Sequence, residues 1–151
     1  KQLRAQRPLA ARTADNTIPV ALTGPAPQYT WGLNDRFYPY RDPYWVEEGQ
    51  RVEMVLSNPT PMGHPMHLHG HEFQILELDG EPLDGAMRDT VYVPKGGTCR
   101  IAFDANNPGI WAFRCHISYH DVRGMFNVVA YRSADLSWWN PSGFKHEHLP
   151  F

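Results

Sequence analysis

The sequence predicts an all-β protein, a sandwich or barrel, on two observations. Short runs of strand-forming residues recur from Thr17 onward, and strong turn signals such as Asp79-Gly80 and Asn107-Pro108-Gly109 separate them. Up to Arg132, no segment shows the long 3.6-residue periodicity of a substantial helix. Evenly spaced short strands joined by turns are typical of sandwiches and barrels.

The predicted strands are runs in which β-branched and aromatic residues alternate with polar ones between turn residues. One run shows the pattern well, because Val52, Met54 and Leu56 would face one side while Arg51 and Glu53 face the other. An antiparallel sheet with one solvent-facing side has this pattern. In chain order, the predicted strands are 18–23, 29–33, 44–47, 52–57, 73–78, 90–93, 98–104, 110–115 and 126–132.

A chain of 151 residues is long enough for one domain with a sizeable core. Residues 1–16 lack periodicity and are predicted to be a linker or extended arm, followed by the domain at 17–132. Residues 133–151 are predicted to be an irregular tail, in which His146 and His148 are solvent-exposed.

The composition excludes some classes of function. The net charge of -2 provides no basic face, so we do not expect a nucleic-acid binder. No apolar run approaches the roughly 18 residues of a membrane-spanning helix, so no membrane span is expected. The chain begins at Lys1 without methionine or an apolar signal segment, which indicates a processed form or a fragment.

Cys115, His120 and Met125 lie close together in the sequence and provide a thiolate, an imidazole and a thioether. With a second imidazole, they form the ligand set of a blue-copper electron-transfer site: two nitrogens and a thiolate in a plane, with a weak axial sulfur. The second imidazole is expected from the histidine cluster that begins at His64, which precedes Pro65 and could turn independently toward the metal. A loop is expected to carry His120.

The other cysteine, Cys99, alternates with Ile101 and Phe103 and is predicted to be a buried strand residue. A disulfide to Cys115 would consume the thiol that the metal site needs, so none is expected.

Side chains alternate along a strand, so Cys115 would face one side while Arg114 and His116 face the other. In the histidine cluster, His67 and His69 likewise share a face. This alternation predicts a second site on the opposite side of the sheet from the first.

Two runs resemble the copper signatures of the last cupredoxin domain of multicopper oxidases, the family of laccases and cuprous oxidases. They are His64-Pro-Met-His67-Leu-His69-Gly70 and Cys115-His116-x-x-x-His120-x-x-x-x-Met125. Segments 29–34, 58–62, 88–94 and 107–111 also resemble that domain, so that nearly all of 12–131 is covered. The resemblance implies a Greek-key β-sandwich of the cupredoxin type.

The resemblance further implies copper as cofactor and a role for each residue of the two signatures. Electrons from a small reducing substrate, of phenol type or Cu(I), would enter near His120 and pass through Cys115-His116 toward a cluster that reduces dioxygen. A periplasmic or extracellular location is also implied. The implied ligands are His64, Cys115, His120 and Met125 for type 1 copper, His67 for type 2 copper, and His69 and His116 for type 3 copper.

Two departures leave the oxidase prediction incomplete. Arg114 stands where the family has a type 3 histidine, and a guanidinium offers no lone pair to a metal. Residues 1–60 contain no histidine, so another cupredoxin domain or identical chains would have to complete the cluster. The alternatives are a stand-alone blue-copper electron carrier without oxidase activity and a homo-oligomer with an interfacial copper site.

Three further expectations concern residues beside these signatures. His71 is expected to have a structural or supporting role rather than to bind a metal. Met62 and Asp121 form either a soft, acidic docking point for Cu(I) or simply a packed methionine and a loop aspartate. Glu72 is an acidic residue that Arg114 could pair with.

Overall fold

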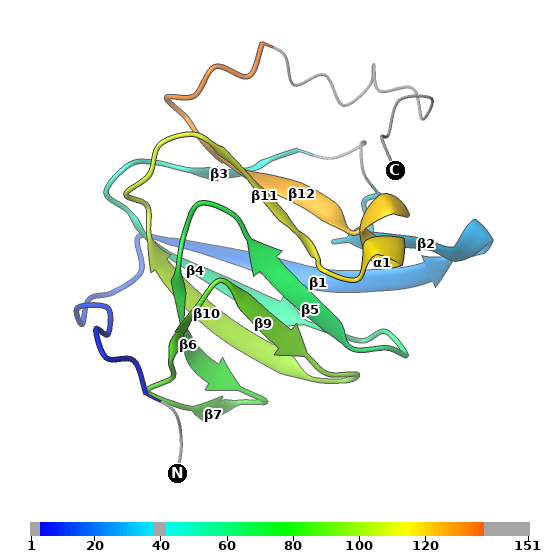
Figure 1. The fold of residues 1–151 in the computed structure, drawn as a ribbon, viewed down its shortest axis with the longest axis horizontal. Helices are drawn as coiled ribbons and strands as arrows, with labels where there is room; N and C mark the ends of the chain where they lie inside the picture. The colour runs from blue at the N-terminus through cyan, green and yellow to red at the C-terminus, as the bar shows by residue number, and fades with distance from the viewer. Residues whose placement is uncertain (1–3, 38–41, 138–151) are drawn as a thin grey trace.

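Two β-sheets make up the fold of the described residues, 4–37 and 42–137, in the computed structural model (Figure 1). Within the first sheet, β1 and β4 pair in parallel and the other pairings are antiparallel. Its strands follow the order β2 (Thr30–Leu33), β1 (Asn16–Ala26), β4 (Arg51–Ser57), β10 (Thr98–Asp104), β6 (Phe73–Leu78) and β7 (Glu81–Pro82), with β8 (Met87–Arg88) paired to β6.

The second sheet carries both histidine-containing signatures. Its edge strands are β3 (Tyr44–Val46) and β9 (Thr90–Val93). Strand β12 (Phe126–Tyr131) lies next to β3 and pairs with it in parallel. Between β12 and β9 lie β11 (Ile110–Cys115) and β5 (His64–Leu68), which pair antiparallel to each other. The two signatures, far apart in the sequence, are therefore on neighbouring strands.

Two short helical segments complete the described fold. A 3-10 turn, η1 (Pro27–Tyr29), links β1 to β2. The five-residue α1 (Ser118–Val122) follows β11 at the end of the second sheet (Figure 1). Within the described ranges, no helix has the length and apolar character to cross a membrane.

One hydrophobic core joins the two sheets. From the first sheet, Val52, Met54 and Leu56 of β4 are fully buried, as their alternation predicts. From the second sheet, Leu68 of β5 and Phe113 of β11 are also fully buried. Each such side chain contributes about 1.5–3 kcal/mol relative to exposure, so the alternating apolar positions fix the inward face of every strand.

All nine predicted strands overlap strands of the structure, with differences at their ends. Tyr29, predicted to begin a strand, lies in η1, and Asn16, predicted to end the arm, begins β1. Strand β5 was not among the nine predicted strands. It contains no β-branched residue, and its inward-facing Met66 and Leu68 lie among Pro65 and histidines. The residues His146 and His148 of the expected tail lie outside the described residues.

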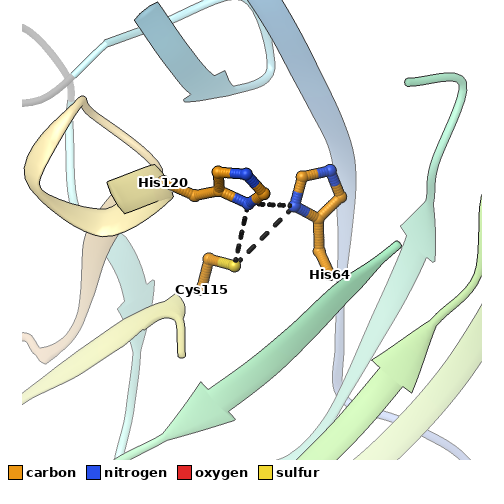
Figure 2. Close-up of side chains that lie close together, drawn as sticks. All are labelled: His64, Cys115 and His120. Atoms are coloured by element: carbon orange, nitrogen blue, oxygen red, sulfur yellow. Dashed lines mark hydrogen bonds between the residues drawn. The ribbon is translucent and has the colours of Figure 1, made fainter. Parts of the chain in front are cut away.

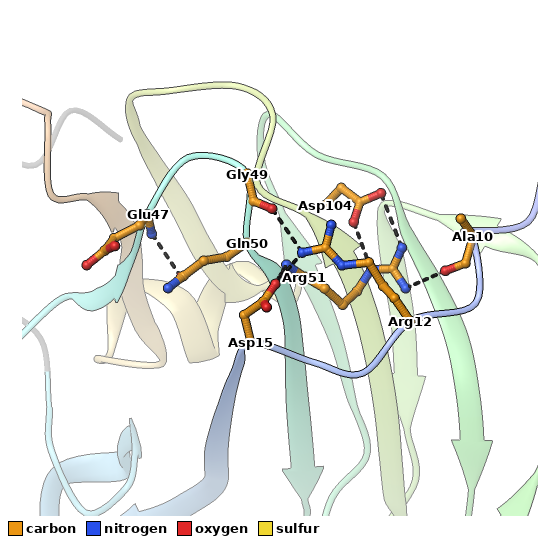
Figure 3. A network of polar contacts seen from close by, with 8 residues as sticks. All are labelled: Ala10, Arg12, Asp15, Glu47, Gly49, Gln50, Arg51 and Asp104. Carbon is orange, nitrogen blue, oxygen red and sulfur yellow. Dashed lines mark hydrogen bonds and ion pairs between the residues drawn. The ribbon is translucent and has the colours of Figure 1, made fainter.

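The described part of the expected N-terminal arm is bonded to the first sheet through Arg51 (Figure 3). The Arg51 guanidinium, almost fully buried, donates to both carboxylate oxygens of Asp104 and, at 2.9 Å, to the carbonyl oxygen of Ala10. Asp15 accepts a hydrogen bond from the Arg51 backbone N–H at 2.6 Å and also pairs with Arg12; these bonds lower the pKa of Asp15. The arm is thereby held against β4 as it enters β1.

Candidate metal centre

Three buried side chains converge at one end of the second sheet (Figure 2). The Nδ1 atoms of His64 and His120 lie 3.0 Å apart. The Cys115 sulfur lies 3.7 Å from the His64 Nδ1 and 3.6 Å from the His120 Nδ1. Within residues 4–37 and 42–137, no other group of histidine, cysteine or acidic side chains meets the same proximity criterion for a metal.

The triangle of donor atoms has the dimensions of a metal site. A point equidistant from the three atoms lies about 2 Å from each, close to the ~2.0 Å metal–nitrogen and ~2.3 Å metal–sulfur bonds of protein-bound zinc. Two imidazoles and one thiolate in a trigonal arrangement suit copper of the blue type. The donor set therefore fits a single copper ion.

His64 reaches the centre through the ordinary alternation of β5. It is the first residue of the strand and faces the interior together with Met66 and Leu68, while Pro65 and His67 face outward. The expectation that His64 turns independently of the strand is wrong, because the inward parity of β5 already directs it to the core.

His120 lies on α1 rather than on the expected loop. The N–H groups of His120 and Asp121 both donate to the carbonyl oxygen of Ile117, which closes one helical turn. The chain then leaves the turn at Gly124, whose φ of +117° is rarely adopted by other residues, and a Cβ there would collide with the carbonyl oxygen of Trp31. Five residues are too few for helical periodicity to be visible in the sequence.

Met125, the predicted axial ligand, is fully buried directly after this turn. Its N–H donates to the carbonyl oxygen of His120 at 2.9 Å, and its own carbonyl oxygen accepts from the N–H of Cys115 at 3.0 Å. The backbone of Met125 is therefore bonded to both donor residues that precede it. Its role as an axial ligand stays a prediction.

A hydrogen-bond chain fixes the tautomer of His64. The Thr60 hydroxyl lies 2.8 Å from the His64 Nε2 and also 2.7 Å from Asn58 Oδ1 and 3.0 Å from the carbonyl oxygen of Met62. Its single proton goes to one of these oxygen acceptors, so the hydroxyl accepts from an Nε2–H of His64. The Nδ1 lone pair of His64 is consequently left for a metal.

Burial sets the protonation of the three donors. It lowers the pKa of His64 to about 4, with help from His120, and also lowers the pKa of His120. Both imidazoles are therefore neutral near pH 7. Burial raises the pKa of the Cys115 thiol to about 11, so the thiol is protonated at neutral pH and a metal must displace that proton on binding.

Trp31 of β2 forms an apolar wall beside both imidazoles. It is fully buried, and its ring centroid lies 4.2 Å from that of His120 and 5.0 Å from that of His64. Its backbone N–H donates to the carbonyl oxygen of Arg123 at 2.9 Å, immediately after α1. The ring of Trp31 excludes water from one side of the donors, and its backbone hydrogen bond to Arg123 holds the end of α1.

On the other face of β5 and β11, three more imidazoles gather as predicted. The ring centroid of His67 lies 4.5 Å from that of His69 and 5.6 Å from that of His116. The His67 Nδ1 bonds the carbonyl oxygen of Asp89 at 2.9 Å, which directs the lone pair to Nε2. The buried Nε2 of His69 has no hydrogen-bond partner among the described residues, and His67 and His69 line an open depression of ≈ 320 Å³.

Arg114 lies on this same outer face, opposite His67 in the pairing of β11 with β5. Its Nη1 donates to Asp121 at 2.9 Å and to the carbonyl oxygen of Cys115 at 3.3 Å. The suggested partner Glu72 is therefore wrong, because Asp121 on α1 lies nearer to the guanidinium. Asp121 is engaged through its Oδ2 in this ion pair, and the suggested Met62–Asp121 docking point stays a prediction.

The hydrogen bonds of His71 support the structural role expected for it. Its Nδ1–H donates to the carbonyl oxygen of His69 at 3.3 Å, so its Nε2 accepts from the Tyr131 hydroxyl at 2.7 Å. Gly70 turns the chain so that His71 faces the interior instead of continuing the outward parity of His69. Cys99 is likewise buried and free, as predicted.

Sequence reasoning missed Thr60, Asn58 and Trp31 as supporting residues of the centre. The signal for the first two was present, because the buried Asn58 and Thr60 lie shortly before His64 in a segment with a turn-forming Asn-Pro pair. Nothing in the local sequence marks Trp31, which reaches the centre only through the packing of β2 beside α1.

A two-sheet, all-β fold of Greek-key type with two imidazoles and a thiolate buried together at one end defines the class of cupredoxin-type copper domains. The chain belongs to the multicopper oxidase family, whose sequence profile matches residues 12–135. Copper is accordingly its cofactor.

The multicopper oxidase MmcO of Mycobacterium tuberculosis is 42% identical over 114 residues, covering 76% of this chain and 22% of that protein. A laccase of Arthroderma benhamiae is 34% identical over 122 residues, covering 74% of this chain and 18% of that protein. The crystal structure of the McoA multicopper oxidase from Aquifex aeolicus matches with a TM-score of 0.71 and 28% identity, over 83% of this chain and 31% of that one. The chain thus spans less than a third of these relatives.

Proposed function

We propose that this chain holds a type 1 copper through His64, Cys115 and His120, with Met125 as axial ligand, and takes single electrons from a small reducing substrate. When bound, the copper supplies a one-electron redox centre in an apolar site. The observation that carries the proposal is the buried donor triangle, in which the Thr60 hydroxyl directs the lone pair of His64 toward the centre.

The residues themselves contribute orientation and exclusion of water. The core and the ring of Trp31 surround the donors, so exchange of water and protons with the centre is restricted. The hydrogen bonds around Thr60 and the turn at α1 hold the donors before metal binds, which lowers the reorganisation that a change of redox state requires.

We further propose that the outer face, with His67 for type 2 copper and His69 and His116 for type 3 copper, is one half of an oxygen-reducing cluster. Support comes from the clustering of the three rings and from the unpartnered Nε2 of His69. Cys115 and His116 are consecutive residues on opposite faces, so a covalent connection links the two sites.

The outer face does not provide a complete ligand set for a three-copper cluster. Arg114 offers no lone pair, and the sequence has no histidine before His64. A second cupredoxin domain, or an identical chain at an interface, would have to supply the remaining ligands. Oxidation of a phenol-type substrate or Cu(I) with dioxygen as acceptor, in a periplasmic or extracellular compartment, is the corresponding whole-protein activity.

Arg114 favours one alternative, a stand-alone blue-copper electron carrier. The guanidinium occupies the outer face and is already paired with Asp121, so this chain alone would hold the inner copper but not the outer cluster. The carrier would exchange electrons with a partner without reducing oxygen.

Copper loading of the full chain tests these proposals, with the two buried free cysteines as matched variants. Cys115→Ser should abolish an intense blue thiolate-to-copper band, while Cys99→Ser, in β10 and away from the donors, should retain it. A wild-type chain without this band, or a band that survives Cys115→Ser, would disprove the copper site.

Copper stoichiometry and oxygen uptake distinguish the three proposed functions, which are the electron carrier, the oligomer with an interfacial copper site, and the oxidase. About one copper per chain with no oxygen uptake supports the carrier. Additional copper that is lost when an oligomer dissociates supports the interfacial site. Oxygen uptake that requires an added N-terminal cupredoxin domain supports the oxidase.

A further inference from the structure

Arg114 and Asp121 are the sequence neighbours of two donors of the candidate copper site. Arg114 precedes Cys115, and Asp121 follows His120. Their side chains form an ion pair of 2.9 Å, in which each is 22% exposed. The ion pair therefore joins β11 to α1 at positions one residue from Cys115 and His120, whose sulfur and Nδ1 lie 3.6 Å apart.

The segment that carries His120 needs such a tie. A five-residue helix is far below the roughly 12–15 residues at which an isolated helix becomes even marginally stable. Several of its backbone hydrogen bonds, such as those to Ile117, are internal to the segment and do not fix its position relative to β11. Its position depends on contacts with the rest of the fold.

Backbone bonds supply some of these contacts. The Trp31 N–H bonds the carbonyl oxygen of Arg123, and the Cys115 N–H bonds the carbonyl oxygen of Met125. Both act on the C-terminal side of the turn. The ring of Trp31 packs against His120, and the Arg114–Asp121 ion pair adds a charged side-chain contact to β11, one residue from His120.

Arg114 and Asp121 are both mostly buried, so each charge depends on the other for compensation. Removing Arg114 would leave a half-buried carboxylate without its partner, which favours movement of the turn toward water. Removing the Asp121 charge would leave the guanidinium unpaired beside the imidazoles of the outer face.

We propose that the Arg114–Asp121 ion pair is a positioning element that holds the His120 turn at the distance from Cys115 that the copper site requires. The inference rests on the proposed type 1 site. Arg114 thus has a role in this chain that a metal-binding histidine at the same position could not perform, because an imidazole is shorter than the side chain that reaches Asp121.

The test uses Arg114→Gln and Asp121→Asn in the full chain, with Arg114→Lys as the conservative variant. Arg100→Gln is the matched control, since Arg100 forms an ion pair with Glu77 at 3.0 Å on the first sheet. The measurements are the copper dissociation constant by chelator competition, the position of the thiolate-to-copper band, and the midpoint potential.

Both neutralising variants should weaken copper binding by about 10-fold, the lower end of the effect of residues that support metal ligands, and should shift the band. The midpoint potential should fall in Arg114→Gln, which leaves an unpaired negative charge near the metal, and rise in Asp121→Asn, which leaves a positive one. Arg114→Lys should lie near wild type, and Arg100→Gln should not differ from it. Arg114→His should weaken the inner site although it adds an imidazole outside.

Wild-type affinity and an unchanged band in both Arg114→Gln and Asp121→Asn would overturn the inference while leaving the copper site intact. A lower melting temperature of the metal-free variants with unchanged affinity would do the same, because it shows a merely structural pair. If Arg114→Gln does not fold, the nearly isosteric Asp121→Asn decides the question alone. A wild-type chain without a thiolate-to-copper band would instead refute the underlying copper site, and the inference with it.

Discussion

Replacing Thr60 with valine tests the hydrogen bond that prepares His64 for copper. The change keeps the shape of the side chain but removes the buried hydroxyl that lies 2.8 Å from the His64 Nε2. In the metal-free variant, the His64 proton can move to Nδ1, where His120 lies 3.0 Å away and can accept it. Nδ1, the atom that faces the centre, would then carry a proton instead of a lone pair.

The size of the effect follows from the fate of that proton. Copper binding to the variant returns the proton to Nε2, which now faces a methyl group, and a buried unpaired donor costs about 1–3 kcal/mol. Copper affinity should therefore fall by roughly 5- to 150-fold. The metal-free protein loses less, about 0.5–1.5 kcal/mol for the loss of a buried hydrogen bond, because Asn58 Oδ1 keeps the backbone N–H of Thr60 as a donor.

The assay is chelator competition for copper affinity, together with urea unfolding of the metal-free protein. Thr60→Ser keeps the hydroxyl and is the matched control, with affinity near wild type. If Thr60→Val bound copper as tightly as Thr60→Ser, the hydroxyl would not set the tautomer of His64, and the reasoning would be refuted even if the variant unfolded more easily.

Three further predictions concern stability. The pKa of His64 is lowered from 6.5 to about 4, so between these pH values the unfolded chain binds a proton that the folded metal-free chain does not. The unfolding free energy of the metal-free protein should therefore fall by up to about 3 kcal/mol as the pH drops from 6.5 to about 4. His64→Gln should flatten this pH dependence, measured by urea unfolding. Gly124→Ala should lower the melting temperature more than Gly80→Ala, because both have positive φ but only the first Cβ meets a backbone carbonyl oxygen; equal losses would contradict the clash. Tyr131→Phe should cost about 1–3 kcal/mol in chemical unfolding by leaving the buried His71 Nε2 without its donor, and no loss would mean that this bond is not stabilising.

The strands and the donor set could be predicted because their signals are local. Alternation alone placed Cys115 on one face of the strand and His116 on the other, and in the structure Cys115 is buried and His116 is exposed. The same rule would also have placed His64 inside, but no strand was predicted there, because Pro65 and the polar residues of the histidine cluster obscure the strand pattern. Once a strand is located, alternation along it is therefore sufficient to predict which of its side chains face the core.

The supporting contacts could not be predicted in the same way, because they join residues that are distant in sequence or lie on a segment too short to show periodicity. The partner of Arg114 depends on the single turn of α1, which brings Asp121 nearer than Glu72. Trp31 meets His120 only because β2 lies beside α1. Such contacts follow from the packing of the two sheets and not from any one segment.

The two-sided arrangement of β11 constrains how the gene for this chain can change in length. Deleting or inserting a single codon between Phe113 and His116 would exchange which of Cys115 and His116 enters the core, and both candidate sites would be lost at once. At the Asp79-Gly80 turn, by contrast, the side chains are exposed and extra residues would extend into solvent. Among natural variants of this chain, insertions and deletions should therefore accumulate in the turns and spare this strand.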